Sequence, residues 1–171
     1  MIERVISGGQ IGADQGGLDG ALRFWGEGTD RIGGWCPSGR RSEDGPIPSK
    51  YPLQETAEWT YPPRTKLNIK GSDGTIIFTS GAPTGGSKLT LSIAEQECKP
   101  SLHIDLALAS VPEAVETLAD WADGYQIQTL NVAGSRETSC PGIQDIVATV
   151  IHDTLVEIGA PPRGSGPLQG R

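Results

Sequence analysis

The side chains best able to do chemistry are hydrogen-bond donors that lie in loops. A basic turn, Cys36-Pro37-Ser38-Gly39-Arg40-Arg41, places two arginines side by side. Paired guanidinium groups favour a phosphate or another oxyanion, because each offers a charged, planar set of N–H donors. From these residues alone, a solvated basic turn that binds no ligand is an equally good interpretation. Glu43 and Asp44 follow, and either accept hydrogen bonds from a ligand or balance the arginines.

Three glycine-containing loops each follow an apolar, strand-like segment. We call residues 8–14 the first glycine loop, residues 80–87 the second and residues 131–139 the third. A strand, a glycine turn and a helix are typical of an anion site, since backbone amides approach the ligand closely and the helix N-terminus adds a positive dipole end. A tight turn without a ligand is the alternative for each loop. The candidate anion-binding residues are Gly8, Gly9, Gln10, Gly12, Ala13, Asp14, Arg40, Arg41, Gly81, Thr84, Gly85, Gly86, Ser87, Asn131, Gly134 and Arg136, with Cys36, Glu43 and Asp44 as further contacts.

Residues that commonly perform catalysis are sparse. His103 lies in an expected strand and His152 in an expected helix, and no Ser–His–Asp order can be traced. The three cysteines are scattered without a C-x-x-C pair, and the two histidines lack metal-ligand spacing, so neither zinc nor another metal is expected. Cys36, in its basic turn, is either structural or a thiolate of low pKa. Binding is therefore better supported than catalysis.

Composition limits the partners and the compartment. The chain has 171 residues and a formal charge of −7, which argues against a nucleic-acid partner. No stretch approaches the roughly 18 apolar residues of a membrane span, and no signal-peptide layout begins the sequence. The odd cysteine count favours a reducing cytoplasm. We expect one domain over residues 1–159 and a disordered tail rich in proline and glycine over residues 160–171.

Strand-like and helix-like segments alternate along the chain. Strands are expected at 5–7, 31–35, 75–79, 101–106 and 126–132, and helices after each of them, including one at 64–70. This alternation predicts an α/β fold, a Rossmann-like three-layer sandwich with a mainly parallel sheet of about five or more strands. The three glycine loops then meet at the carboxyl edge of the sheet, and the proline-rich loop 42–63 covers them. Gln10 replaces the second glycine of G-x-G-x-x-G, so NAD is not expected.

Several motifs occur together in one order. They are Gly8-Gly9-Gln10-x-Gly12-Ala13-Asp14, Gly34-Trp35-Cys36-Pro37-x-Gly39-Arg40-Arg41-x-Glu43-Asp44-Gly45-Pro46-Ile47-Pro48, Ser72-Asp73-Gly74-Thr75, Thr84-Gly85-Gly86 and Asn131-Val132-Ala133-Gly134-x-Arg136-Glu137. Over residues 2–158 the chain resembles the molybdenum-cofactor carrier proteins, which are related to lysine-decarboxylase-like phosphoribohydrolases. The resemblance implies a Rossmann-like homo-oligomer, a dimer or tetramer, whose small anionic ligand is the phosphate-bearing molybdenum cofactor (molybdopterin) or an oxyanion such as molybdate.

One departure separates the chain from the related hydrolases. Those enzymes carry P-G-G-x-G-T-x-x-E, whose glutamate acts in cleaving an N-glycosidic bond. Here Ser92 stands in place of that glutamate, and Glu95 is an imperfect substitute. The sequence therefore predicts a non-catalytic binding or carrier protein. A nucleoside-monophosphate N-glycosidic hydrolase and a ligand-sensing module are the alternatives.

Overall fold

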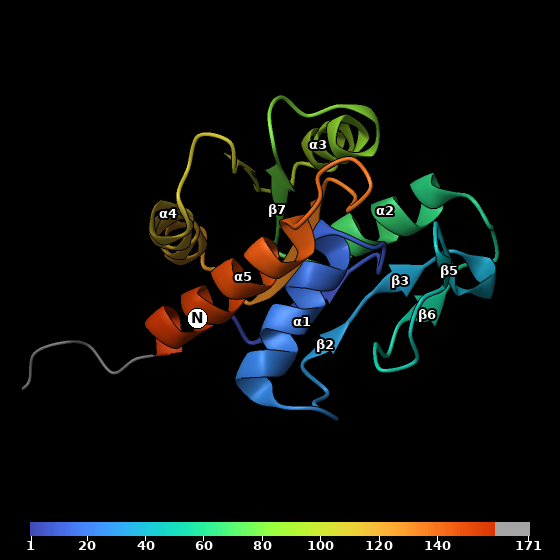
Figure 1. Ribbon diagram of the computed structural model, residues 1–171, viewed down its shortest axis with the longest axis horizontal. Helices are drawn as coiled ribbons and strands as arrows, with labels where there is room; N and C mark the ends of the chain where they lie inside the picture. The colour runs from blue at the N-terminus through green and yellow to red at the C-terminus, as the bar shows by residue number, and fades with distance from the viewer. Residues whose placement is uncertain (160–171) are drawn as a thin grey trace, which may run out of the picture.

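A parallel β-sheet of five strands forms the centre of the protein (Figure 1). The structure is a computed structural model that describes residues 1–159, so the tail at 160–171 lies outside the described residues. The strands are β1 (Arg4–Ser7), β2 (Ile32–Gly33), β7 (Gly74–Thr79), β8 (Ser101–Asp105) and β9 (Thr129–Gly134), in the order β2-β1-β9-β7-β8. Each neighbouring pair is parallel, which confirms the expected α/β class and the parallel sheet.

Helices cover both faces of the sheet and bury it. They are α1 (Ala13–Trp25), α2 (Tyr61–Lys70), α3 (Gly85–Gln96), α4 (Val111–Gly124) and α5 (Ile143–Gly159). Helices α4, α5 and α1 pack side by side on one face, and α2 packs beside α3 on the other (Figure 1). Strand residues such as Ile76, Phe78 and Val132 are fully buried between these layers, as expected for a parallel sheet with two covered faces. In residues 1–159 no helix combines the length and the apolar character that crossing a membrane requires.

The strand order locates the edge where a ligand would bind. If β9 and α5 stood at the start of the chain, the order would be 3-2-1-4-5, which is that of the Rossmann fold. The chain direction across the sheet reverses between β9 and β7. Ligands of such sheets bind beyond the carboxyl ends of the strands at this switch point. The loops that follow β1, β7 and β9 all lie at that edge.

Residues 34–60 form an ordered extension beside β2, to the right in Figure 1. It contains β3 (Trp35–Cys36) paired with β6 (Gln54–Glu55), the short helix η1 (Ser38–Arg40), and a hairpin of β4 (Arg41–Ser42) and β5 (Gly45–Pro46). Tyr51 anchors the extension: it is 1% exposed, and its hydroxyl donates to Asp19 Oδ1 on α1 at 2.8 Å. The proline-rich loop is packed, as expected.

Three expected boundaries are wrong for local reasons. The strand at 31–35 breaks at Gly34, where φ is +126° and a Cβ would overlap the carbonyl oxygen of Ser7. The last strand begins at Thr129, because Gln126 at φ +54° ends α4 and delays the strand. Helix α2 begins at Tyr61, since the prolines that follow it occupy a first turn whose N–H groups need no partner.

Glycines in α1 let this helix lie very close to its neighbours. A Cβ at Gly17 would stand 2.6 Å from Val132 of β9, and one at Gly20 would stand 2.5 Å from the carbonyl oxygen of Ala148 on α5. The start of α1 is tied to the end of β9, where the N–H of Ala13 donates to the carbonyl oxygen of Ser135 at 3.0 Å. This close packing joins the first and third glycine loops.

Candidate functional site

A pocket of about 250 Å³ lies at the carboxyl edge of the sheet, at the switch point. The loops that follow β1, β7 and β9 meet α2 there. Its lining residues are Gln10, Asp14, Tyr61, Pro62, Arg64, Thr65, Gly86, Leu89, Thr90, Ala133, Gly134 and Arg136. Each of the three glycine loops therefore contributes to one cavity, although α2 supplies as much of its wall as they do.

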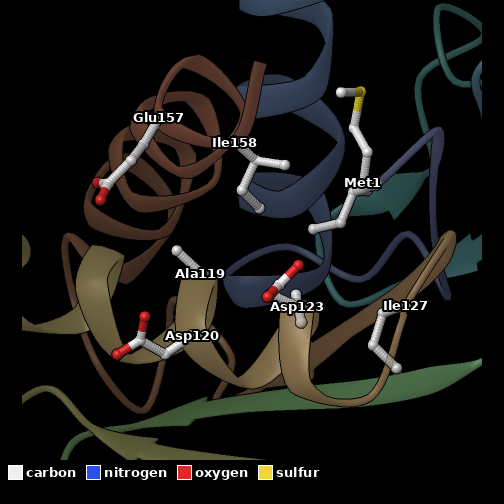
Figure 2. Close-up of a pocket in the computed structure, with 9 residues that line it drawn as sticks. Met1, Ala119, Asp120, Asp123, Ile127, Glu157 and Ile158 are labelled. Carbon is white, nitrogen blue, oxygen red and sulfur yellow. The ribbon is translucent and has the colours of Figure 1, made fainter. Parts of the chain in front are cut away.

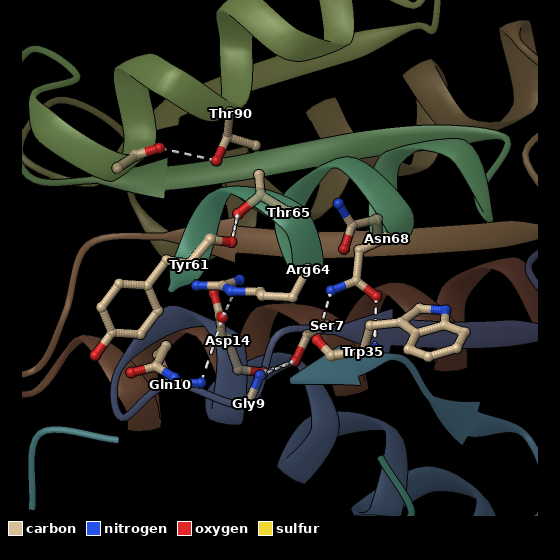
Figure 3. A network of polar contacts seen from close by, with 12 residues as sticks. Ser7, Gly9, Gln10, Asp14, Trp35, Tyr61, Arg64, Thr65, Asn68 and Thr90 are labelled. Carbon is tan, nitrogen blue, oxygen red and sulfur yellow. Dashed lines mark hydrogen bonds and ion pairs between the residues drawn. The ribbon is translucent and has the colours of Figure 1, made fainter. Parts of the chain in front are cut away.

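A buried ion pair forms one side of the pocket. Arg64 Nη1 lies 3.2 Å from Asp14 Oδ2, and the two side chains are 12% and 6% exposed (Figure 3). The backbone N–H of Gln10 donates to the same carboxylate oxygen at 3.3 Å. Burial raises the pKa of Asp14, although the positive charge of Arg64 opposes this shift. Gly8 is required here, because a Cβ at that position would overlap the guanidinium of Arg64.

Three arginines surround the ring of Tyr61. The guanidinium carbons of Arg136, Arg41 and Arg64 lie 4.8, 5.2 and 5.7 Å from its centroid. These are cation–π distances, and the three guanidinium groups gather positive charge around Tyr61, which lines the pocket. Arg136 also pairs with Glu43 of the β4–β5 hairpin, and this hydrogen bond lowers the pKa of the Glu43 carboxyl. The hairpin is thereby attached to the third glycine loop.

The amides of the first glycine loop already have protein partners. The N–H groups of Gly9, Gln10, Gly12 and Ala13 donate respectively to Ser7 Oγ, Asp14 Oδ2, Gln144 Oε1 and the Ser135 carbonyl oxygen. This loop therefore does not offer a ligand the open row of amides that the sequence suggested. Its glycines instead permit close packing, and its contribution to the pocket comes from the side chains of Gln10 and Asp14.

The second glycine loop is open. Gly85 and Gly86 begin α3, both are exposed, and a Cβ on either would meet no atom within 4 Å. Thr84 precedes them and makes no side-chain cap bond. The N–H groups of Ser87 and Lys88 donate to the carbonyl oxygen of Thr84 at 3.0 and 3.3 Å, so the start of α3 offers a ligand the N–H groups of Gly85 and Gly86 and a positive dipole end. Gly86 lines the pocket, which places these donors beside Arg64 and Arg136.

Several expected site residues lie away from the pocket. Asn131 is 3% exposed and donates from its side chain to Thr75 Oγ1 at 3.1 Å, inside the sheet. Cys36 is fully buried, and burial raises the pKa of its thiol, which is the opposite of a low-pKa thiolate. The N–H of Gly81 donates to Asp105 Oδ1 at 2.7 Å. The other expected residues that do not line the pocket are Gly8, Gly9, Gly12, Ala13, Arg41, Glu43, Asp44, Thr84, Gly85 and Ser87.

Arg40 has a structural role that the sequence did not reveal. Its side chain donates to the carbonyl oxygens of Ile47, Pro48, Tyr51 and Leu53, at distances from 2.9 to 3.4 Å. Arg40 and Arg41 are therefore not an equivalent pair. Arg40 connects several segments of the extension by hydrogen bonds. The guanidinium carbon of Arg41 instead lies 4.7 Å from the ring centroid of Trp59 and 5.2 Å from that of Tyr61.

Arg40→Ala is expected to destabilise the protein by about 2–3 kcal/mol, because several carbonyl groups lose a charged donor together. Arg41→Ala is expected to cost less than about 1 kcal/mol, since its contacts are exposed. Urea denaturation of the two variants measures this difference. Equal losses of stability would show that the extension does not depend on Arg40.

The ring of His103 is engaged with a hydroxyl at the edge of the sheet. Its Nε2 lies 2.7 Å from Thr79 Oγ1, and that hydroxyl donates to the carbonyl oxygen of Gly81 at 2.5 Å. The hydroxyl has one proton, so when Thr79 donates to Gly81 the matching tautomer of His103 is the one that carries its proton on Nε2. Within residues 1–159, no three His, Cys, Asp or Glu side chains converge in a way that could hold a metal ion.

Another pocket lies at the opposite, amino edge of the sheet. It measures about 270 Å³, and Asp120, Asp123 and Glu157 lie around it (Figure 2). These residues stand in the last turns of α4 and α5, where the helix dipole is negative. Carboxylates and negative dipole ends both disfavour an anion. The pocket at the carboxyl edge is therefore the better candidate for the predicted anionic ligand.

Comparison with known proteins agrees with this architecture. The model of the circularly permutated YpsA SLOG family matches residues 5–155. The chain belongs to this family. The strand order β2-β1-β9-β7-β8, which becomes that of the Rossmann fold when β9 and α5 are moved to the start, fits a circularly permuted family.

A similar solved structure is a crystal structure from Syntrophus aciditrophicus SB. That protein bears the provisional name of a molybdenum carrier protein. It is 40% identical, with a TM-score of 0.82 over 92% of this chain and 94% of that one. No curated protein matches the chain.

Proposed function

We propose that this protein is a non-catalytic carrier whose pocket at the carboxyl edge binds a phosphate-bearing anionic cofactor, the molybdenum cofactor. One observation carries the proposal: the open N-terminus of α3 meets Arg64 and Arg136 in a single cavity. Helix N-termini and arginines both favour phosphate groups and oxyanions. The provisional name of the crystallised relative as a molybdenum carrier supports the same class of ligand.

The size of the pocket supports a small ligand. Its volume of about 250 Å³ lies just below the range of roughly 300–1,000 Å³ that is usual for small-molecule sites. A single fused ring system with one phosphate, as in molybdopterin, comes closer to this volume than a dinucleotide does. The apolar residues Pro62, Leu89 and Ala133 complete the wall, so the cavity also favours a ligand with an apolar body.

Thermal unfolding with added ligand tests the proposal. A ligand that binds only the folded state, at about a hundred times its dissociation constant, adds roughly 2.7 kcal/mol to stability. We expect a phosphate-bearing pterin, and molybdate or tungstate at high concentration, to raise the melting temperature. An unchanged melting temperature with all of these compounds would contradict the proposal.

Anion affinity is expected to rise as the pH is lowered toward the raised pKa of Asp14. Burial raises the pKa of Asp14 above its ordinary value of 3.8, so protonation begins at a higher pH and removes a negative charge beside Arg64. Sulfate is a suitable probe because its own charge does not change in this range. Calorimetry should show that Asp14→Asn abolishes the pH dependence. A pH dependence that survives in the variant would assign it to another group, such as Glu43.

A second candidate function, N-glycosidic hydrolysis, is favoured by one observation. Asp14 lines the pocket with a raised pKa, and a protonated buried carboxyl is what a general acid requires. However, Ser92 and Glu95 are both exposed on α3, and neither lines the pocket. Asp14 is also held by Arg64 and the amide of Gln10.

We therefore expect no release of free base from adenosine, guanosine or cytokinin-riboside monophosphates. Chromatography of the reaction mixture measures the free base, with Asp14→Asn and Glu95→Gln as controls. Turnover that either variant abolished would make the protein a phosphoribohydrolase with a relocated acid.

A further inference from the structure

Two buried polar atoms that belong to pocket-lining residues lack a hydrogen-bond partner among residues 1–159. They are Gln10 Oε1, an acceptor, and Arg64 Nε, whose N–H is a donor. Buried polar atoms are nearly always paired in folded proteins, and each exception requires an explanation. Both residues line the same cavity, from different elements. A ligand that carries both a donor and an acceptor would satisfy the two atoms together.

Gln10 holds its acceptor in a fixed position. The residue is 3% exposed, and its Nε2 donates to the carbonyl oxygen of Arg41 at 2.8 Å. This bond determines which end of the amide is the nitrogen, so Oε1 remains as the free acceptor. An oxygen acceptor does not favour a phosphate or an oxyanion, which has no proton to donate at neutral pH. Gln10 therefore serves a part of the ligand other than its phosphate.

Arg64 holds its donor equally firmly. Nη1 is bound to Asp14, and the side chain is 12% exposed, in a helix that begins three residues earlier at Tyr61 (Figure 3). Nε is the buried donor of this side chain that has no protein partner among residues 1–159. An N–H group and an adjacent carbonyl or ring nitrogen occur together on the edge of an aminated or amide-bearing heterocycle. The apolar residues Pro62 and Leu89 provide the contact that such a flat ring requires.

We infer that the pocket recognises a phosphate-bearing planar heterocycle by its donor–acceptor edge, with Gln10 Oε1 accepting an N–H and Arg64 Nε donating to the neighbouring acceptor. This inference rests on the proposed function, because it describes the remainder of the ligand whose phosphate lies at α3. Pterins and guanine share this edge. A pocket built for molybdate or free phosphate alone would have no use for the Gln10 acceptor.

Calorimetric titration with three phosphate monoesters tests the inference on the wild-type protein. GMP carries the complete edge, purine riboside 5′-monophosphate carries a ring without an N–H donor, and ribose 5-phosphate carries no ring. We expect GMP to bind at least about tenfold more tightly than purine riboside 5′-monophosphate. Equal affinities of these two compounds would overturn the inference. The proposed function fails separately, if none of the three compounds and no pterin phosphate binds.

Gln10→Met removes the acceptor at nearly constant volume, so the preference for GMP over purine riboside 5′-monophosphate should fall to less than about twofold. Ser42→Ala is the matched control, because Ser42 Oγ is also buried and unpartnered among residues 1–159 but does not line the pocket. It should keep the wild-type preference. A preference that persists in Gln10→Met would overturn the inference. If that variant does not fold, the wild-type comparison decides by itself.

A fourth ligand, the phosphate ester of 6-hydroxymethylpterin, distinguishes the two heterocycles that carry this edge, a pterin and guanine. Tighter binding than GMP assigns the pocket to a pterin, and weaker binding assigns it to a guanine nucleotide. Whichever of GMP and the pterin phosphate binds more tightly, the inference holds if purine riboside 5′-monophosphate binds less tightly than both. Purine riboside 5′-monophosphate binding as tightly as both would overturn it.

Discussion

Gly86→Asp is expected to abolish binding of phosphate-bearing ligands and to leave the protein at least as stable as the wild type. The new carboxylate would lie in the first turn of α3, where a negative charge stabilises a helix by about 0.3–1 kcal/mol. A Cβ at Gly86 meets open space, so the change introduces no clash. The same carboxylate would occupy the place of the ligand's phosphate and repel it. Loss of charge-assisted bonds worth roughly 1.5–3 kcal/mol corresponds to a fall in affinity of about 10- to 100-fold or more.

Two variants control for charge and for bulk. Ser92→Asp adds the same charge at an exposed position of α3, six residues further along, and should leave ligand binding nearly unchanged. Gly86→Ala adds only a methyl group. Gly85 is less suitable for this test, because its φ of +47° strains any side chain that replaces the glycine. Undiminished binding by Gly86→Asp, measured by calorimetry, would place the anion elsewhere.

Arg64→Met is expected to cost about 3–5 kcal/mol of stability and to eliminate ligand binding. Removing one partner of a buried ion pair leaves the other charge without compensation, and that penalty is of this size. Asp14 would remain almost fully buried at 6% side-chain exposure. The pocket would also lose one of its two lining arginines. Urea denaturation measures the first effect, and calorimetry with a phosphate monoester measures the second.

A double variant separates these two roles of Arg64. Replacing both charges, in Arg64→Met with Asp14→Leu, should restore most of the lost stability, because a buried ion pair exchanged for apolar side chains is often neutral. Ligand binding should not return. A double variant that bound phosphate as the wild type does would show that Arg64 only maintains the fold. A single variant as stable as the wild type would contradict the buried ion pair itself.

The sheet and its loops could be predicted from the sequence because their signals are local. Apolar, β-branched runs such as residues 75–79 mark buried parallel strands, and parallel strands place the loops that follow them at one edge. The start of α4 has a local signal of the same kind, because Ser110 followed three residues later by Glu113 is the spacing of the capping box that these residues form. The motifs also indicated the family.

The composition of the site depended on contacts between distant residues. Tyr61 and Arg64 lie on a helix that starts with two prolines, and no glycine or acidic neighbour marked them as ligand contacts. The one signal in the sequence was that Tyr61 and Arg64 are three residues apart, a separation that places both side chains on one face of a helix. Arg40 had the same local sequence context as Arg41, and only the folded extension turns its side chain toward four carbonyl oxygens. The amides of the first glycine loop are occupied for the same reason, since their acceptors come partly from residues 135 and 144.

Mass spectrometry of the small molecules that co-purify with the protein tests the carrier function most directly. The wild type and Gly86→Asp should be produced in parallel in cells that make molybdenum cofactor, purified under the same conditions, and denatured to release bound compounds. A phosphate-bearing pterin, or its oxidised derivative, should be released from the wild type and be absent from the variant. Equal amounts of the pterin from both proteins, or a wild-type ligand without a phosphate group, would contradict a carrier that holds its cofactor at the start of α3.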